Sequence, residues 1–144
     1  MTEALADLAI REVVELHAFF EAWLRPANSS EGNGSALDPA RFERGFAPAF
    51  RLVGPDGLIR ERDTVAAGIH GMRGSRPAAF RMEVSGFRPV WQQGDAILLE
   101  YVETQYGQGK TTKRQSTALL CRAASAPLGI AWLHLQETWL QNVG

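Results

Sequence analysis

The chain has 144 residues, 45% of them hydrophobic and 22% charged, and this length and composition predict one globular domain spanning residues 1–144. Its 15 basic and 16 acidic residues leave a net charge of -1, which argues against a nucleic-acid or membrane partner held by bulk charge. A single cysteine, Cys121, excludes an internal disulfide, and without a signal-peptide pattern or a long apolar stretch we expect a soluble, cytoplasmic protein.

The first segment predicts a long amphipathic helix. Between Leu5 and Leu24 apolar residues recur every three to five positions, and most charged residues fall on the opposite arc. Pro26 ends the pattern. Glu12 is an exception, since a helical wheel places it near the apolar side. His17 lies at the edge of the apolar stripe, where its side chain would reach into a cavity beneath the helix.

The segment after this helix predicts a loop and then a short second helix. Residues 26–37 hold many turn-forming residues without periodicity, and we expect a mobile loop there. Asp38 followed by Pro39 predicts a helix start, because aspartate caps a free backbone N–H and proline suits the first helical position. Gly45 ends this helix, and residues 46–53 then predict a first strand.

A hairpin and a third helix are expected next. Residues 54–57 read Gly-Pro-Asp-Gly, which predicts a tight turn because proline presets φ and glycine accepts a positive φ. Residues 58–60 would form the short return strand. Asp63 is expected to cap a third helix that reaches about Arg73.

The second half of the chain predicts four long strands separated by short turns. They are expected at residues 79–92, 96–106, 111–122 and 129–140. Consecutive strands with short connections form an antiparallel meander. The order of elements therefore predicts an α+β fold in which a curved, mostly antiparallel sheet encloses a pocket with few polar groups.

In four segments the sequence resembles the nuclear transport factor 2-like, or ketosteroid isomerase-like, superfamily, and in particular its small bacterial members of unassigned function. The segments are VVELHAFFEAWL (13–24), FAPAFRLVGPDG (46–57), RQSTALL (114–120) and WLHLQETW (132–139). The resemblance implies a cone-shaped α+β barrel, with helices packed on a highly curved sheet around a central pocket, and a homodimer formed through the sheets. It names no reaction, because the superfamily contains isomerases, cyclases, dehydratases, ligand carriers and interaction domains.

The resemblance also bears on steroid isomerase chemistry. That branch of the superfamily uses a carboxylate directly before a proline, a second acid and a tyrosine. Here Gly54 precedes Pro55, and residues 116–119 contain no acid. Asp56 is interpreted as a solvated turn residue, and His17 stands where the tyrosine would be. The sequence therefore argues against this reaction.

In the last strand, strict alternation places Trp132, His134 and Gln136 on one face, and Leu135 and Glu137 on the other. We favour the first face as the one that lines the pocket, where His134 and Gln136 would orient a small ligand. The alternative is that this face is the convex one, where the same residues would belong to a dimer interface or to a wet surface.

The two strands before it predict cross-strand pairs. Arg114 and Ser116 would lie opposite Glu103 and Tyr101 across the hairpin. A pair between Glu103 and Arg114 is either structural or an anchor for a ligand carboxylate or carbonyl group.

These residues define a candidate site. The candidates for acid–base catalysis are His17, His134 and Glu103, since imidazole and carboxylate groups transfer protons. No cofactor is expected, and no metal site is expected because no ligand cluster has metal-binding spacing. The candidate ligand-binding residues are His17, Tyr101, Glu103, Arg114, Ser116, His134 and Gln136.

Three functions stay open. The leading one is a small-molecule-binding protein with a mostly apolar pocket, whose partner is a small hydrophobic molecule. The first alternative is a cofactor-free isomerase, cyclase or dehydratase, which requires His17 or His134 within hydrogen-bond reach of Glu103 or Tyr101. The second alternative is a dimerisation or scaffold module.

Overall fold

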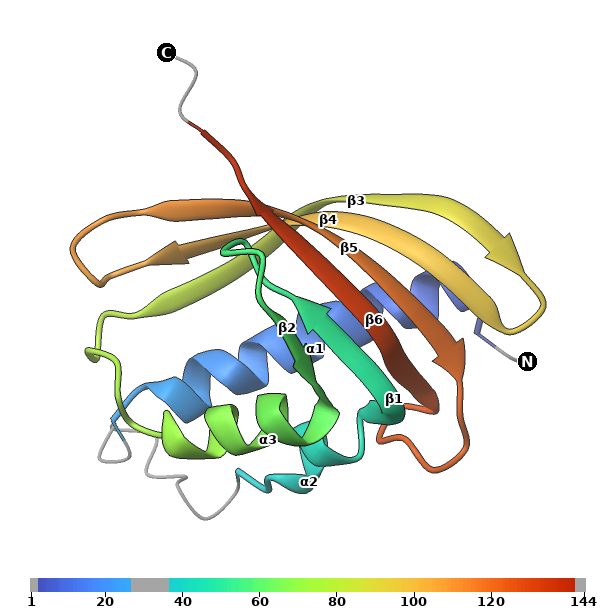
Figure 1. Cartoon of the computed structure of the whole chain (residues 1–144), viewed down its shortest axis with the longest axis horizontal. Coiled ribbons are helices and arrows are strands. Elements are labelled where there is room, and N and C mark those ends of the chain that lie inside the picture. Colours follow the sequence, from blue (N-terminus) through green and yellow to red (C-terminus); the bar gives the residue numbers. More distant parts are fainter. Residues whose placement is uncertain (1–2, 27–36, 142–144) are drawn as a thin grey trace.

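A computed structural model describes residues 3–26 and 37–141 of the protein. The predicted loop at 26–37 therefore lies, except for its two ends, outside the described residues. The remaining elements follow the predicted order of helices, a hairpin and a strand-rich second half. Figure 1 shows their arrangement, with the long first helix and the short helices on one side of a curved sheet.

The first helix, α1 (Leu5–Leu24), has the bounds that its apolar periodicity predicts. Its apolar stripe is buried in the hydrophobic core, where the helix packs mainly against the third strand. Glu12 and His17 are buried on the same face. The helix ends at Leu24 because the residue before a proline, Arg25, adopts an extended conformation.

The predicted capping of the second helix, α2 (Ala40–Glu43), is confirmed. Asp38 Oδ1 accepts a hydrogen bond from the Ala40 backbone N–H at 2.9 Å, which satisfies one free donor at the helix start. The strand β1 (Phe46–Val53) follows directly.

The hairpin from β1 to β2 (Ile59–Glu61) turns where predicted, with Gly57 at φ 81°. The third helix, α3 (Arg62–Gly71), begins two residues earlier than a cap at Asp63 would require, and it ends two residues before the expected Arg73. The prediction that Asp63 caps it is wrong, because Asp63 lies in the first turn and its carboxylate instead accepts a hydrogen bond from Arg62.

Four long strands complete the sheet: β3 (Arg81–Gln93), β4 (Ala96–Tyr106), β5 (Thr112–Arg122) and β6 (Ile130–Trp139). Each pairs antiparallel with the next, which confirms the predicted meander. Strand β1 pairs parallel with β6, so the sheet order is β2-β1-β6-β5-β4-β3. The edge strands β2 and β3 do not meet, and the curved sheet stays open.

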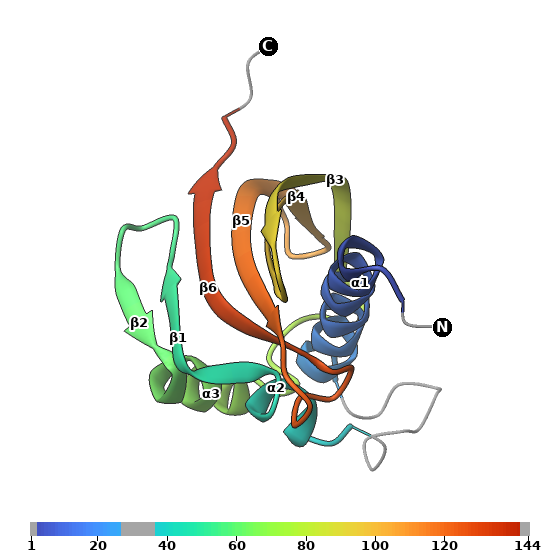
Figure 2. The same ribbon diagram turned by 90° about the vertical axis from the view of Figure 1, so that its right-hand side faces the viewer.

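The helices cover the concave side of this sheet. In Figure 2 the strands β3 to β6 bend around α1, while β1 and β2 stand at the opposite edge above α3. The α+β cone with helices on a curved, mostly antiparallel sheet is therefore confirmed. None of the helices formed by residues 3–26 and 37–141 has the length and apolarity needed to cross a membrane.

One irregularity in β6 decides which side chains face the helices. Between Trp132 and His134 the register of β6 against β5 shifts by one residue, which marks a β-bulge. The bulge moves Trp132 to the concave face together with Glu137, and it leaves His134 and Gln136 on the other face. The expected face shared by Trp132, His134 and Gln136 is therefore wrong, because strict alternation does not hold through a bulge.

Candidate functional site

A cavity of about 550 Å³ lies between α1, α3 and the concave face of the sheet. Cavities of about 300–1,000 Å³ are typical of small-molecule sites. Most of its wall is apolar, with aromatic and aliphatic side chains from both helices and from β1 and β6. These side chains include Leu16, Phe20, Phe50, Ile69, Met72 and Trp132.

At one side of the cavity, α1 and β4 bring two ionisable side chains together. His17 Nε2 lies 3.0 Å from Glu103 Oε1, and both side chains are almost fully buried. His17 Nδ1 lies 2.8 Å from the Val13 carbonyl oxygen, one helical turn back along α1. Both ring nitrogens of His17 are therefore engaged.

These contacts determine the protonation of the pair. A carbonyl oxygen only accepts, so His17 Nδ1 donates to Val13. Although burial favours the neutral acid, the hydrogen bond and charge of His17 lower the pKa of Glu103 to about 2. Burial also opposes a charged imidazole, but the contact with Glu103 raises the pKa of His17. The pair is an imidazolium and a carboxylate, and Nε2 donates to Glu103.

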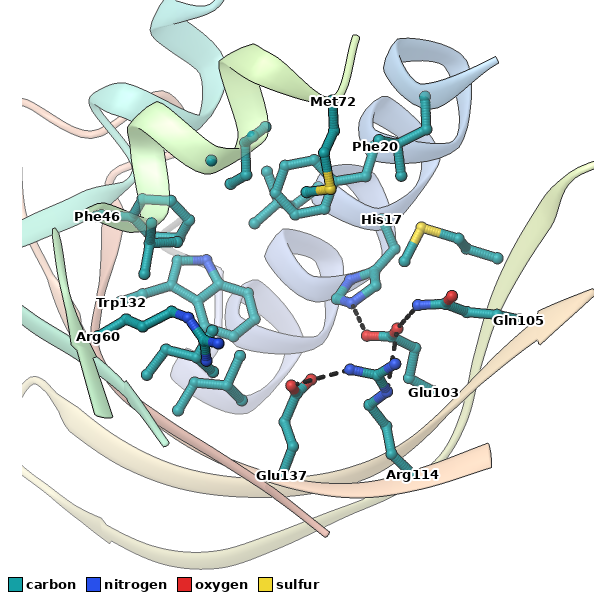
Figure 3. Close-up of a pocket in the computed structure, with 18 of the residues that line it drawn as sticks. His17, Phe20, Phe46, Arg60, Met72, Glu103, Gln105, Arg114, Trp132 and Glu137 are labelled. Atoms are coloured by element: carbon teal, nitrogen blue, oxygen red, sulfur yellow. Dashed lines mark hydrogen bonds and ion pairs between the residues drawn. The ribbon is translucent and has the colours of Figure 1, made fainter. Parts of the chain in front are cut away.

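Two further residues extend the pair into a cluster of four buried charges. Arg114 Nη1 donates to Glu137 Oε1 at 3.1 Å, and Arg114 Nε lies 3.7 Å from Glu103 Oε2. Gln105 donates to the same Glu103 oxygen at 2.6 Å. Figure 3 shows these side chains converging from β4, β5 and β6 beside His17. We call His17, Glu103, Arg114 and Glu137 the ionic cluster.

The ionic cluster has hydrogen-bonding atoms that form no hydrogen bond within the cluster. Arg114 Nε is buried without a hydrogen-bond partner. Within the described part of the chain, Glu137 forms its hydrogen bond through Oε1, which leaves Oε2 free. Burial raises the pKa of Glu137, and the charge of Glu103 adds to this shift. Such a group can accept or donate a proton at the cavity wall.

The predicted cross-strand register is confirmed, since Glu103 pairs with Arg114 and Tyr101 with Ser116. Tyr101 and Ser116 are fully buried on the same face as the ionic cluster, but they do not line the cavity. Neither hydroxyl group has a hydrogen-bond partner within 3.5 Å, although the two residues face each other across the strands. Burial raises the pKa of Tyr101 well above its ordinary value, so it stays a neutral phenol.

The other two predicted site residues are placed outside the cavity. His134 is half-buried and Gln136 is exposed, both on the face turned away from α1. The bulge in β6 gives their expected places to Leu135 and Glu137. The structure thus brings His17, Glu103 and Arg114 together and leaves His134 and Gln136 apart from them.

Five polar residues of the lining were not predicted: Glu137, Gln105, Arg60, Thr64 and Arg76. Glu137 was assigned to the wrong face of β6. The sequence did contain a signal for Glu137. It is a charged residue between Leu135 and Trp139 on one face of a predicted central strand, and a charge that is buried there needs a partner. Arg60 lies in the three-residue strand β2, and Arg76 lies in the segment after α3. Both segments are too short or too irregular for the sequence to show which way a side chain points.

The described ranges contain no group of three or more His, Cys, Asp or Glu side chains arranged to hold a metal ion. The lining itself offers hydrogen bonds, fixed charges and proton transfer in an apolar surrounding. In such a surrounding, buried charges act over short distances with little screening by water.

Comparison with known proteins places the fold among characterised structures. No family model matches the chain, and no curated protein matches it in sequence. An NTF-2-like protein of unknown function from Pseudomonas aeruginosa is 28% identical, with a TM-score of 0.76 over 93% of this chain and 99% of that chain.

Two more distant structures share the fold alone. A candidate scytalone dehydratase from Novosphingobium aromaticivorans is 8% identical, with a TM-score of 0.70 over 94% of this chain and 83% of that chain. The CaMKII hub of S. rosetta is 13% identical, with a TM-score of 0.66 over 97% of this chain and 100% of that chain. A shared fold does not transfer an activity.

Proposed function

The chain belongs to the nuclear transport factor 2-like superfamily, and we propose that it uses the cavity of this fold to bind a small, mostly apolar molecule. The observation that carries the proposal is the contrast inside the cavity. An apolar wall encloses a volume of about 550 Å³, and four charged side chains meet at one side of it. The apolar wall supplies affinity, and the ionic cluster orients a polar group of the ligand.

The energetics of burial support this proposal. Taking a charged group out of water costs several kcal/mol, and a core needs no such group for stability alone. In the ionic cluster this cost is offset only in part, because Arg114 Nε lies 3.7 Å from Glu103 Oε2 and forms no hydrogen bond. A ligand carbonyl or hydroxyl oxygen next to Arg114 would complete the hydrogen bonding.

The test uses the neutral dye N-phenyl-1-naphthylamine, whose fluorescence rises in apolar surroundings. We expect one dye per chain. Ile69→Trp, which fills the cavity from α3, abolishes binding, whereas Gln136→Ala on the opposite face of β6 changes Kd less than about twofold. Melting curves confirm that each variant folds. Absent dye binding, or unchanged binding in folded Ile69→Trp, contradicts the proposal.

A second candidate function is proton transfer on the bound molecule, as in an isomerase, cyclase or dehydratase. The specific observation is the free Oε2 of Glu137. Both nitrogens of His17 are engaged, and the two oxygens of Glu103 accept from His17 and Gln105. Glu137 is therefore the group that exchanges a proton with a ligand, while the Arg114 guanidinium stabilises the negative charge that develops on the ligand.

This second function is tested by hydrogen exchange. Ligands found by a melting-temperature screen of metabolites are incubated with the protein in D2O, and their mass is followed. We expect deuterium to enter a carbon-bound position of at least one ligand, and Glu137→Gln to slow this at least about a hundredfold while binding persists. Exchange at the wild-type rate in Glu137→Gln, or no exchange into any bound ligand, rules this function out.

A further inference from the structure

Three arginines line the cavity, and they differ in their partners. Arg114 donates to Glu137 at 3.1 Å, and Arg60 donates to Asp56 at 3.2 Å. Arg76 is different, because no carboxylate among the described residues lies within ion-pair distance of it. One cation of the wall thus has no counter-ion from this chain's described residues.

The contacts of Arg76 leave much of its donor capacity unused. Its Nη1 donates to Ser75 Oγ at 3.2 Å, and its Nη2 lies 3.9 Å from Met72 Sδ, a weak acceptor. Its Nε is buried without a hydrogen-bond partner. A guanidinium has five N–H donors in a planar fork that matches a carboxylate, so the free side of Arg76 suits an anion.

The backbone fixes where this anion would lie. The Arg76 backbone N–H donates to the Leu24 carbonyl at 2.8 Å, which holds the residue at the end of α1 and just after α3. Its neighbour Met72 and the α1 residue Phe20 face the ionic cluster from the other side of the cavity (Figure 3). The cavity therefore has a cation at one side and the ionic cluster at the other, with apolar wall elsewhere.

The charge of the lining points the same way. With His17 protonated, four cationic side chains line the cavity and two anionic ones, Glu103 and Glu137, oppose them. Asp56 compensates the charge of Arg60 from outside the cavity. A neutral ligand therefore leaves the charge of Arg76 without a counter-ion among the described residues, and an anionic ligand supplies one.

We propose that the cavity binds an apolar anion, a molecule with a hydrophobic body and a carboxylate or similar group held by Arg76. The carboxylate forms charge-assisted hydrogen bonds with the Arg76 guanidinium, and the apolar body fills the space between Phe20, Ile69 and Trp132. An uncharged polar group at the far end of the ligand reaches the ionic cluster. This inference rests on the proposed function and names the ligand class of that same cavity.

The experiment compares two dyes that differ by one charged group. N-Phenyl-1-naphthylamine is neutral, and 8-anilinonaphthalene-1-sulfonate is the same molecule with a sulfonate. We expect the anionic dye to bind wild-type protein at least about tenfold more tightly, because its sulfonate forms charge-assisted hydrogen bonds with the Arg76 guanidinium and the neutral dye does not. In Arg76→Gln this advantage disappears, while the neutral dye binds as before. 1-Naphthoate displaces the anionic dye at a concentration about tenfold lower than 1-naphthamide requires.

Two other arginines provide matched controls. Arg60→Gln reduces the preference for the anionic dye less than Arg76→Gln does, because Asp56 already neutralises Arg60. Arg88→Gln has no effect, since Arg88 is an exposed residue outside the cavity that pairs with Glu100. Melting curves verify that all three variants fold.

The outcomes separate this inference from the proposed function. If the neutral dye binds and the anionic dye binds no better, the preference for an anion is wrong and the binding function survives. The same holds if the preference is unchanged in folded Arg76→Gln. If neither dye binds, the proposed function fails and this inference fails with it.

Discussion

Two groups of buried charge lie on the same face of α1, and they differ in how fully their polar atoms are satisfied. The first group, which we call the Glu12 group, consists of Glu12, Arg41 and Trp132. Glu12 accepts two hydrogen bonds from Arg41, at 2.9 and 3.1 Å, and a third from Trp132 Nε1 at 2.9 Å. His17, five residues later, belongs to the ionic cluster, in which Arg114 Nε has no hydrogen-bond partner. One group is complete, and the other retains free hydrogen-bonding capacity.

The difference indicates separate roles. The Glu12 group joins α1, α2 and β6. Glu12 and Arg41 do not line the cavity, and the Glu12 carboxylate holds the indole of Trp132 in place through a hydrogen bond. Because Trp132 is part of the cavity wall, this group positions the wall from behind. The ionic cluster faces the cavity itself. A fully satisfied buried charge rigidifies a structure, whereas a partly satisfied one is available to a ligand.

The largest effect is expected from breaking the satisfied group. Arg41→Met leaves the Glu12 carboxylate buried without its cation, and we expect the free energy of unfolding at pH 7 to fall by about 3–5 kcal/mol. Urea unfolding measures this loss. Burial already raises the pKa of Glu12, and without Arg41 the carboxyl group protonates more readily. The loss should therefore shrink at pH 4, which loss of packing alone would not do.

The matched control for Arg41→Met is Arg88→Met. Arg88 pairs with Glu100 on the surface, at 3.2 Å, with 67% of its side chain exposed. Exposed ion pairs contribute about 0–1 kcal/mol, so this variant should unfold almost as the wild type does. Equal losses in the two variants would show that burial does not distinguish the Glu12 group from a surface pair.

Local patterns predicted the parts of the fold that depend on local structure. The bounds of α1 follow from its periodicity, and those of β4 follow from a strand segment between two turns. The pairing of Glu103 with Arg114 follows from the short turn between β4 and β5, because a short hairpin fixes the register of both strands. His17 was placed at a cavity by its position on the helix. The homodimer through the sheets stays a prediction.

The misses are features that depend on distant segments. The parallel pairing of β1 with β6 joins the N-terminal hairpin to the last strand of the chain, and no local pattern encodes it. The bulge near Trp132 adds one residue to β6. Trp132 and Glu137 therefore face the same side of the sheet, whereas strict alternation places them on opposite sides. Glu12 was recognised as an exception on the helical wheel, but its partner Arg41 follows an unrelated loop and becomes visible only in the fold.

A smaller effect, opposite in sign for the two groups, is expected from pH. The ordinary pKa of a glutamate is 4.5, and that of Glu103 is lowered to about 2, so Glu103 stabilises the fold above pH 4.5. That contribution is lost as the pH falls from 4.5 towards 2. Glu12 has a raised pKa, so its contribution is full below pH 4.5 and is lost as the pH rises through that raised value.

The variants Glu103→Gln and Glu12→Gln separate the two contributions to the pH dependence of the free energy of unfolding. Glu103→Gln should cost about 2 kcal/mol at neutral pH, the value of hydrogen bonds to a charged group, and should flatten the loss of stability below pH 4.5. Glu12→Gln should instead flatten the change above pH 4.5. By NMR, the pKa of His17 should fall in Glu103→Gln, because the carboxylate that raises it is gone. If both variants change the free energy of unfolding in the same pH range, the predicted difference between Glu103 and Glu12 is wrong. Each glutamate would then respond to burial alone.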